Sequence, residues 1–162
     1  ATPASGLKKY EDVITKEAKT NTGFFKVHKV KDKFYFELSD SIMGRDILVV
    51  NRVSKAPVNR YKSLVGYPGD QIGENVIQFE KVPNNKVFIR NISYLEQSKD
   101  TLGMYFSVKN SNIQPIVATF NIEATKKDST NKSRNFVIEV TSLLHNDNYI
   151  FFFDTRMKKY RG

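Results

Sequence analysis

The stretch from Phe24 to Val53 constrains the fold more than any other part of the sequence. Residues 34–38 read FYFEL, so that Phe, Phe and Leu alternate with Tyr and Glu. A period of two is typical of a strand with one buried face. Residues 31–33 (KDK) leave only a tight connection to the apolar run of residues 24–30, and we therefore predict a β-hairpin.

A single helical turn should follow this hairpin. Ser39 and Asp40 offer side-chain oxygens to cap its start, and Ile42 supplies its apolar side. Gly44 can adopt the positive φ that ends such a turn. From Arg45 onward the sequence predicts a third strand, which ends near Val53.

The other elements are shorter. Apolar residues at helical spacing predict an amphipathic helix from Lys8 to Lys19, with Thr20 to Gly23 closing it. Residues 74–81 and 86–93 alternate on either side of Pro83-Asn84-Asn85, which predicts a second hairpin. Residues 116–124 and 135–141 predict a third. A further short helix is expected from residue 100 or 101 to Lys109, and residues 150–153 form either a last strand or a loosely held segment.

These patterns predict a mainly β fold with about seven or eight antiparallel strands, arranged as a sandwich or a partial barrel. The 162 residues suffice for one domain with a substantial core. We expect a flexible lead-in at residues 1–7, a β-rich domain at 8–154 with possible sub-regions 8–43 and 44–154, and a basic tail at 155–162.

The chain is strongly basic, with a formal net charge of +9. Such a surface attracts polyanions without choosing among nucleic acid, anionic glycan and acidic headgroups. The basic residues are scattered, apart from one C-terminal cluster formed by Arg156, Lys158, Lys159 and Arg161. This cluster is either solvated surface or a polyanion site. No apolar run is long enough for a membrane span.

Residues that could carry catalysis are few. The chain has no cysteine, and only His28 and His145 could contribute imidazole ligands, without an HExxH motif. The alternation of its strand predicts that His28 lies on the sheet surface. Phe34 and Phe36 suit burial better than base stacking, because they share a face with Leu38. We therefore expect no catalytic residue, metal ligand or cofactor in this chain.

The glycine- and proline-rich segment from Ser54 to Gly73 predicts a long loop that lacks the phosphate-binding motifs. Loops of this length are often functional. Asp70 and Gln71 in this loop are therefore candidate interaction residues, together with the C-terminal basic cluster. A hydrolase that uses Glu and Lys or Asp on this loop is a third hypothesis, which alanine substitutions at Asp70 and Glu74 would test.

Four ordered blocks carry a family resemblance: YEDVITKEAKTNTGFFKVHKVKDKFYFEL, DSIMGRDILVVNRVSKAP, GDQIGENVIQFEK and KNSNIQPIVATFNIEA. From about Lys9 to Thr141 they resemble the N-terminal region of large zinc-dependent metalloproteases from Bacteroidetes, where they belong to two adjoining domains of unknown function. The resemblance implies that the zinc-binding HExxH helix lies downstream. After Thr141 the chain departs from the family pattern, which suggests a truncated gene, a trimmed fragment or a short paralogue.

The resemblance implies an exported protein, although this chain carries no signal peptide. The leading hypothesis is a non-catalytic accessory domain that packs against a peptidase domain of the same polypeptide, assists its folding or presents its substrate. Zinc would then be held only by that downstream domain. The alternative is a free-standing basic β module that binds an anionic polymer. The sequence leaves the oligomeric state open.

Overall fold

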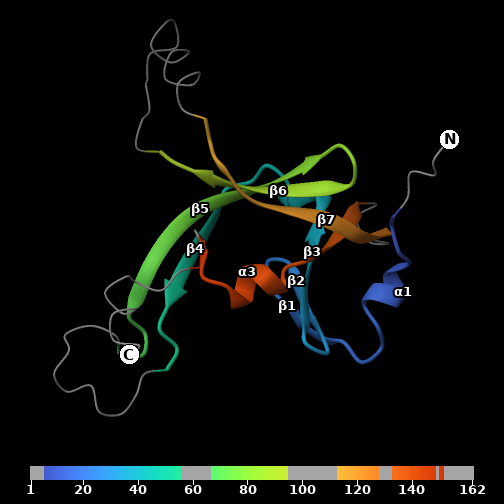
Figure 1. The fold of residues 1–162 in the computed structure, drawn as a ribbon, viewed down its shortest axis with the longest axis horizontal. Coiled ribbons are helices and arrows are strands. Elements are labelled where there is room, and N and C mark those ends of the chain that lie inside the picture. Colours follow the sequence, from blue (N-terminus) through green and yellow to red (C-terminus); the bar gives the residue numbers. More distant parts are fainter. Residues whose placement is uncertain (1–5, 56–66, 95–112, 128–132, 149, 152–162) are drawn as a thin grey trace, which may run out of the picture.

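The computed structural model describes residues 6–55, 67–94, 113–127, 133–148 and 150–151, and its strands form one eight-stranded antiparallel sheet (Figure 1). The strands lie in the order β1-β2-β3-β8-β7-β6-β5-β4. In chain order the elements are α1 (Tyr10–Val13), β1 (Lys19–Thr22), β2 (Lys26–Val30), β3 (Lys33–Ser39), the 3-10 turn η1 (Asp40–Ile42), β4 (Ile47–Arg52), β5 (Gln71–Val82), β6 (Lys86–Ile92), β7 (Ile116–Lys127), β8 (Arg134–Glu139) and α3 (Thr141–His145).

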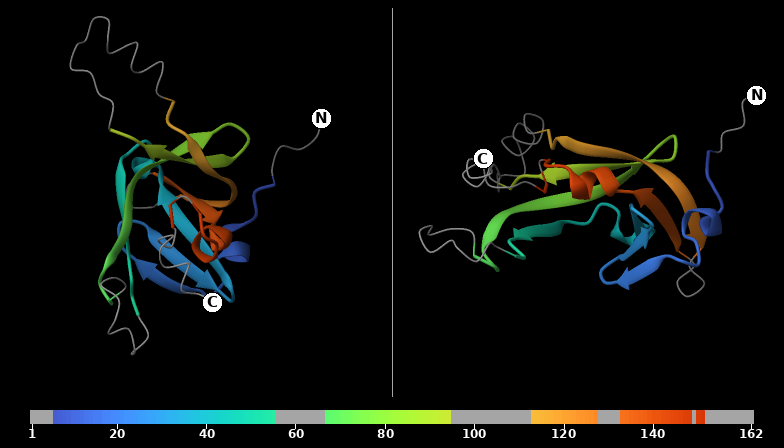
Figure 2. Two further views of the ribbon diagram at one scale, coloured as in Figure 1. Left: turned by 60° about the vertical axis from the view of Figure 1, so that its left-hand side comes forward. Right: turned by 60° about the horizontal axis from the view of Figure 1, so that its bottom comes forward.

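The sheet curls into a half-barrel with α3 in its hollow (Figure 2). The prediction of a mainly β, antiparallel fold is confirmed, and the partial barrel, not the sandwich, is the form it takes. The concave face holds the main core, in which Phe36, Phe79, Phe136 and Ile138 pack with Leu143 of α3. Burial of this single apolar face stabilises the curled sheet.

The predicted hairpins are confirmed. β2 and β3 pair around the 31–32 turn, where Lys31 has φ 54°. β5 and β6 pair across Asn84 and Asn85, whose φ values are 64° and 54°, and asparagine tolerates this left-handed region. β7 pairs with β8 as expected.

The turn after β3 also follows the prediction. The Ser39 hydroxyl accepts a hydrogen bond from the Ser41 amide, and Ile42 is buried in the core. Gly44 has φ +71°, and its amide donates to the carbonyl oxygen of Phe79 at 2.8 Å. This contact fixes the start of β4 against β5.

The predicted helix from Lys8 to Lys19 is wrong in extent. Only residues 10–13 are helical, and 19–22 form the edge strand β1, which pairs with β2. The short helix α1 has no side-chain cap and no basic residue in its last turn. Nothing local therefore extends it to the predicted length, and isolated helices of about 12 residues are only marginally stable. The threonines of KTNT favour the extended conformation that pairing with β2 stabilises.

β3 is buried on both faces, which corrects the prediction of a half-buried strand. Tyr35 and Glu37 lie on the convex face, where α1 covers them, and Val13 of α1 packs with Tyr35, Ala124 and Val137. The predicted alternation of side chains along β3 is present, but α1 packs on the convex face that was expected to be exposed to solvent.

Residues 6–55 and 67–151 interleave in the sheet. The first part supplies β1, β2 and β3 at one side and β4 at the other, and β5 to β8 of the second part lie between them. β3 pairs with β8, and β4 with β5. The core is therefore built jointly by both parts of the chain.

The C-terminal part differs in detail from the prediction. β8 ends at Glu139 and α3 begins at Thr141, whose hydroxyl oxygen accepts a hydrogen bond from the Phe34 amide at 3.0 Å. Ile150 is buried in the core without belonging to a strand. The expected helix at 100–109, the lead-in up to residue 5 and the basic tail lie outside the described residues.

Candidate functional site

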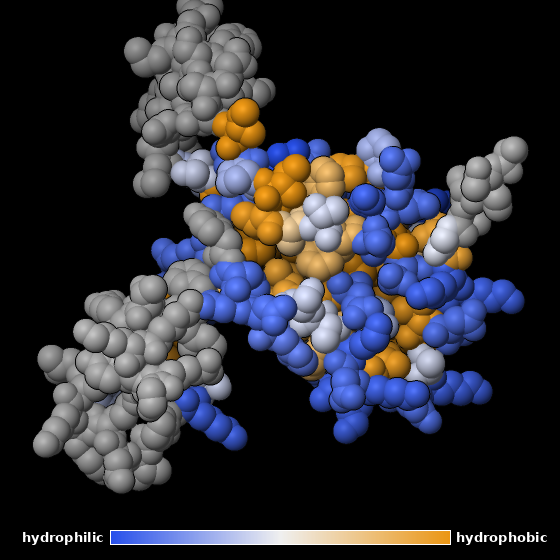
Figure 3. Space-filling view, in the orientation of Figure 1, coloured by the Kyte–Doolittle hydropathy of each residue, from blue (hydrophilic) through white to orange (hydrophobic). Residues whose placement is uncertain are grey.

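An apolar groove of about 510 Å³ opens on the concave side, where the half-barrel does not close. Phe24, Phe25, Leu48, Val49, Phe79 and Phe151 contribute to its lining. Phe24 is 62% exposed and Leu48 61%, both high values for large apolar side chains. The space-filling view shows apolar surface around β5 to β7, whereas the side with α1 and β1 is largely hydrophilic (Figure 3).

Contacts within the protein hold the groove in shape. The ring of Phe25 lies 4.8 Å from that of Phe36 and 6.1 Å from that of Phe79, measured between centroids. On the other side, the Asn51 side chain donates to the carbonyl oxygen of Ile150 at 2.6 Å and so fixes the adjacent Phe151 near β4. Apart from Asp46 the lining of this groove is apolar, which suits it to receive an apolar side chain or segment.

The sequence did not identify this groove. Its walls come from segments far apart in the chain, the residues before β2, strand β4 and residues 150–151, and only the fold brings them together. The available signal was the apolar content of residues 47–50 together with Phe24 and Phe25. In the sequence alone these residues were indistinguishable from ordinary core.

The predicted loop from Ser54 to Gly73 is wrong at its end, because residues 71–73 already belong to β5 and pair with β4. Asp70 lies in the turn that leads into β5, and Gln71 is the first residue of that strand. The Asp70 carboxylate accepts a hydrogen bond from the Tyr67 amide at 2.8 Å, and its carbonyl oxygen accepts one from Val53. Gln71 pairs with Arg52 in the sheet and donates to the Glu74 carboxylate. Both residues thus contribute to the β4–β5 connection, and the fold does not bring them to the apolar groove. Arg156, Lys158, Lys159 and Arg161 lie outside the described residues.

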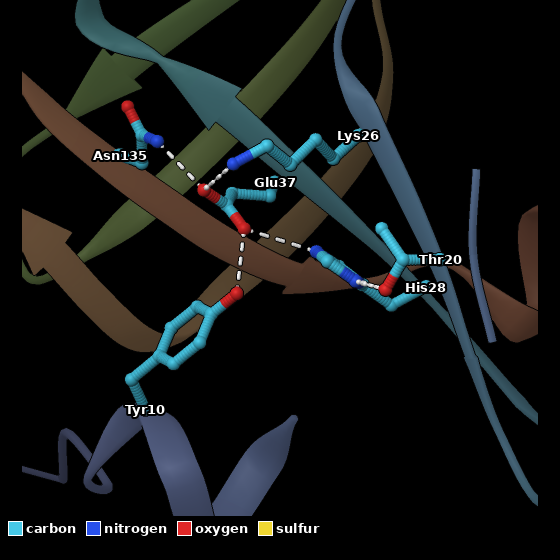
Figure 4. A network of polar contacts seen from close by, with 6 residues as sticks. All are labelled: Tyr10, Thr20, Lys26, His28, Glu37 and Asn135. Atoms are coloured by element: carbon cyan, nitrogen blue, oxygen red, sulfur yellow. Dashed lines mark hydrogen bonds and ion pairs between the residues drawn. The ribbon is translucent and has the colours of Figure 1, made fainter. Parts of the chain in front are cut away.

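A buried polar network occupies the opposite, convex face, centred on Glu37 (Figure 4). One carboxylate oxygen of Glu37 accepts from Tyr10 at 2.7 Å and from His28 Nε2 at 3.0 Å. The other accepts from Asn135 at 2.6 Å and from Lys26 at 3.3 Å. Side chains from α1, β2 and β8 thus meet at one side chain of β3.

These donors determine the charge state of Glu37. Burial raises the pKa of this carboxyl, but hydrogen bonds from Tyr10, Asn135 and His28, together with the charge of Lys26, outweigh it and lower the pKa to about 2. A carboxylate only accepts, so His28 Nε2 carries hydrogen, and in the neutral imidazole Nδ1 accepts from the Thr20 hydroxyl at 2.8 Å. Burial and Glu37 together raise the pKa of Tyr10.

His28 corrects the sequence-based expectation, because it is 2% exposed and not at the sheet surface. Its ring lies between the Thr20 hydroxyl of β1 and the Glu37 carboxylate of β3. The order hydroxyl, imidazole, carboxylate in Thr20, His28 and Glu37 resembles a nucleophilic triad, but the imidazole and carboxylate side chains are only 3% and 0% exposed. We therefore interpret the network as a structural tie. Among the described residues, no group of three or more His, Cys, Asp or Glu side chains could hold a metal ion.

The fold and the groove define a class of protein: a single-sheet antiparallel β domain with an apolar groove. Two family models match the chain, a domain of unknown function DUF5118 at residues 7–56 and a domain of unknown function DUF5117 at 69–161. The second match covers more than half of the chain, which therefore belongs to the DUF5117 family. No curated protein and no solved structure matches significantly. Among the described residues, no helix has the length and apolar character to cross a membrane.

The two matched regions correspond to the two interleaved parts of the sheet. The DUF5118 region contributes β1 to β4 and the DUF5117 region contributes β5 to β8. Glu37 and Asn135 come from different regions, as do Lys8 and Glu123, which pair at 2.6 Å. The Glu37 network thus lies across the boundary between the two families.

Proposed function

We propose that this chain is a non-catalytic accessory domain of an exported zinc metalloprotease-like protein, and that its groove holds an apolar segment of the peptidase domain in the same polypeptide. The groove is the observation that carries this proposal. Exposed patches that are apolar and preshaped are typical of interaction surfaces. The ordered sequence blocks that resemble the Bacteroidetes metalloprotease family support the choice of partner.

The proposal assigns no chemistry to this chain. The pKa values of Glu37 and Tyr10 are shifted from their ordinary values, but these two side chains bond to each other in the buried network on the convex face. Binding would instead depend on burial of exposed apolar lining side chains such as Phe24. Covering the exposed part of one such side chain contributes roughly 1–2 kcal/mol, which corresponds to about a 5- to 30-fold change in affinity.

The test is calorimetric titration of this chain with the HExxH-containing domain encoded in the same reading frame. Phe24→Lys should weaken binding about 10-fold or more, whereas Ile116→Lys, which changes an exposed apolar residue on β7, should leave it unchanged. Equal loss in both variants, or no binding, would reject the proposal. Binding of a peptide substrate in place of the domain would reassign the groove to substrate presentation.

A second candidate function is binding of an anionic polymer. Two pairs of like charges lie directly opposite each other in the sheet, Lys19 with Lys29 and Lys127 with Arg134. Such pairs are unfavourable unless a counter-charge compensates them. The net charge of +9 points the same way. Affinity for heparin or an oligonucleotide should fall steeply between low and physiological salt, and a flat response would reject this function.

A further inference from the structure

Strand β4 is the last strand of the sheet. β5 is its only strand partner in the described part of the chain, and no backbone hydrogen bond from another described residue reaches its outer side between Ile47 and Val50. Natural edge strands usually carry a lysine, a proline or a bulge that prevents association with another chain. The run Ile47-Leu48-Val49-Val50 carries none of these, and the register shift in this pair lies beyond it, at Asn51 and Arg52.

Both faces of this edge strand are apolar. Ile47 and Val49 face the core, whereas Leu48 is 61% exposed and Val50 38%. The exposed face ends in opposite charges, with Asp46 before the strand and Arg52 at its end. Asp46 continues the pairing with β5, since its carboxylate accepts a hydrogen bond from Gln78, the residue opposite it in the extended register.

We propose that β4 pairs antiparallel with β4 of a second copy of this chain, about a two-fold axis at Val49. In an antiparallel pair, opposite residues must both direct their backbone groups towards the partner. Along β4 this direction alternates from one residue to the next. An odd-numbered residue of one copy must therefore lie opposite an odd-numbered residue of the other copy, and an even-numbered residue opposite an even-numbered one. The two-fold axis then runs between two copies of the same residue. For a pairing centred on the middle of the strand, that residue is Leu48, Val49 or Val50.

Side-chain complementarity selects among these three registers. With Val49 on the axis, Asp46 faces Arg52 of the partner subunit and Leu48 faces Val50 of the partner subunit, each contact occurring twice. With Leu48 on the axis, Asp46 would face an apolar valine. With Val50 on the axis, Arg52 would face an apolar leucine. Only the Val49 register combines unlike charges with apolar pairs, both of which stabilise antiparallel sheets.

Cysteine cross-linking tests the register directly, because the chain contains no native cysteine. Directly opposite positions have Cβ atoms close enough for a disulfide, whereas positions offset along the strands do not. Under oxidation, Val49→Cys should give disulfide-linked dimers, and Leu48→Cys or Val50→Cys alone should not. A mixture of the Leu48→Cys and Val50→Cys proteins should form the mixed disulfide. Cross-linking of Leu48→Cys or Val50→Cys alone, in preference to Val49→Cys, would overturn the register.

Sedimentation velocity over a concentration series tests the association itself. Asp46→Arg and Arg52→Asp should each raise the dimer dissociation constant about tenfold, since each creates two like-charge contacts. The double variant should restore it, a result that a local folding defect would not give. Asp32→Arg, in the exposed β2–β3 turn, is the matched control. Two results would overturn the proposal: a protein that stays monomeric at millimolar concentration, or single charge-reversal variants whose weakened dimer the double variant does not restore.

Self-association and groove binding are separable. Residues 46–49 belong to both surfaces, whereas Phe24 lines the groove without belonging to β4, and Arg52 takes part in the edge contact without lining the groove. Phe24→Lys should therefore leave the dimer intact, and Arg52→Asp should leave groove binding intact. Failure of either proposal would leave the other standing.

Discussion

Replacement of Glu37 by glutamine tests the buried network most sharply. The carboxylate accepts from four side chains, whereas a glutamine amide has one oxygen and would turn its NH₂ group towards other donors. The pKa of Glu37 falls from an ordinary 4.5 to about 2 in the folded protein. A difference of this size corresponds to about 3 kcal/mol of stability at pH 7.

The sign gives the pH window. Because the folded-state pKa is lowered, this stabilisation is fully present above pH 4.5 and is lost as the pH falls towards 2. The Gln variant lacks it at every pH. The difference in the free energy of unfolding between the two proteins should therefore be about 3 kcal/mol at pH 7 and less than half of this at pH 3.

Urea denaturation followed by circular dichroism measures this difference at each pH. Glu123→Gln is the matched control, because Glu123 pairs with an exposed lysine and its replacement should cost less than about 1 kcal/mol. A Glu37→Gln cost that is equal at pH 7 and pH 3 would refute the assignment of Glu37 as a buried carboxylate.

Two further substitutions probe the same structure. Gly44→Ala should destabilise the protein by about 1–2 kcal/mol, because φ at Gly44 is +71°. A Cβ at Gly44 would meet no atom within 4 Å, so the cost comes from the backbone conformation alone. Gly6→Ala is the control: Gly6 has no such φ, and its replacement should be neutral in the same denaturation assay. Tyr10→Phe removes one donor to Glu37 and should raise the pKa of that carboxyl, with a loss of about 1.5–3 kcal/mol; a Glu37 carboxyl titration by NMR that is unchanged in the variant would contradict this.

Local sequence patterns predicted the elements that rest on local chemistry. The turn at Gly44 and the hairpin at Asn84 and Asn85 follow from backbone preferences, and each formed where expected. The helix at residues 8–19 did not, because the pairing of residues 19–22 with β2 is a tertiary interaction that a window of neighbouring residues does not contain.

The site was harder to predict for the same reason. His28 and Glu37 looked like surface residues, because strand alternation gives the face of a side chain but not what covers that face. Tertiary contacts with α1, β1 and β8 bury them. The groove likewise depends on the strand order and on the curl of the sheet. Four strands separate β3 from β4 in the sheet, yet Phe36 of β3 and Val49 of β4 line the same groove.

The central claim is that the DUF5118 and DUF5117 regions form one interleaved sheet and unfold together. Hydrogen exchange in rising urea, read by mass spectrometry, tests it most directly, because it resolves the opening of separate parts of a protein. Amides of β2 and β3 and amides of β6 to β8 should converge on one unfolding free energy and one urea dependence. Opening of the first region at lower urea, with protection retained in the second, would contradict the claim.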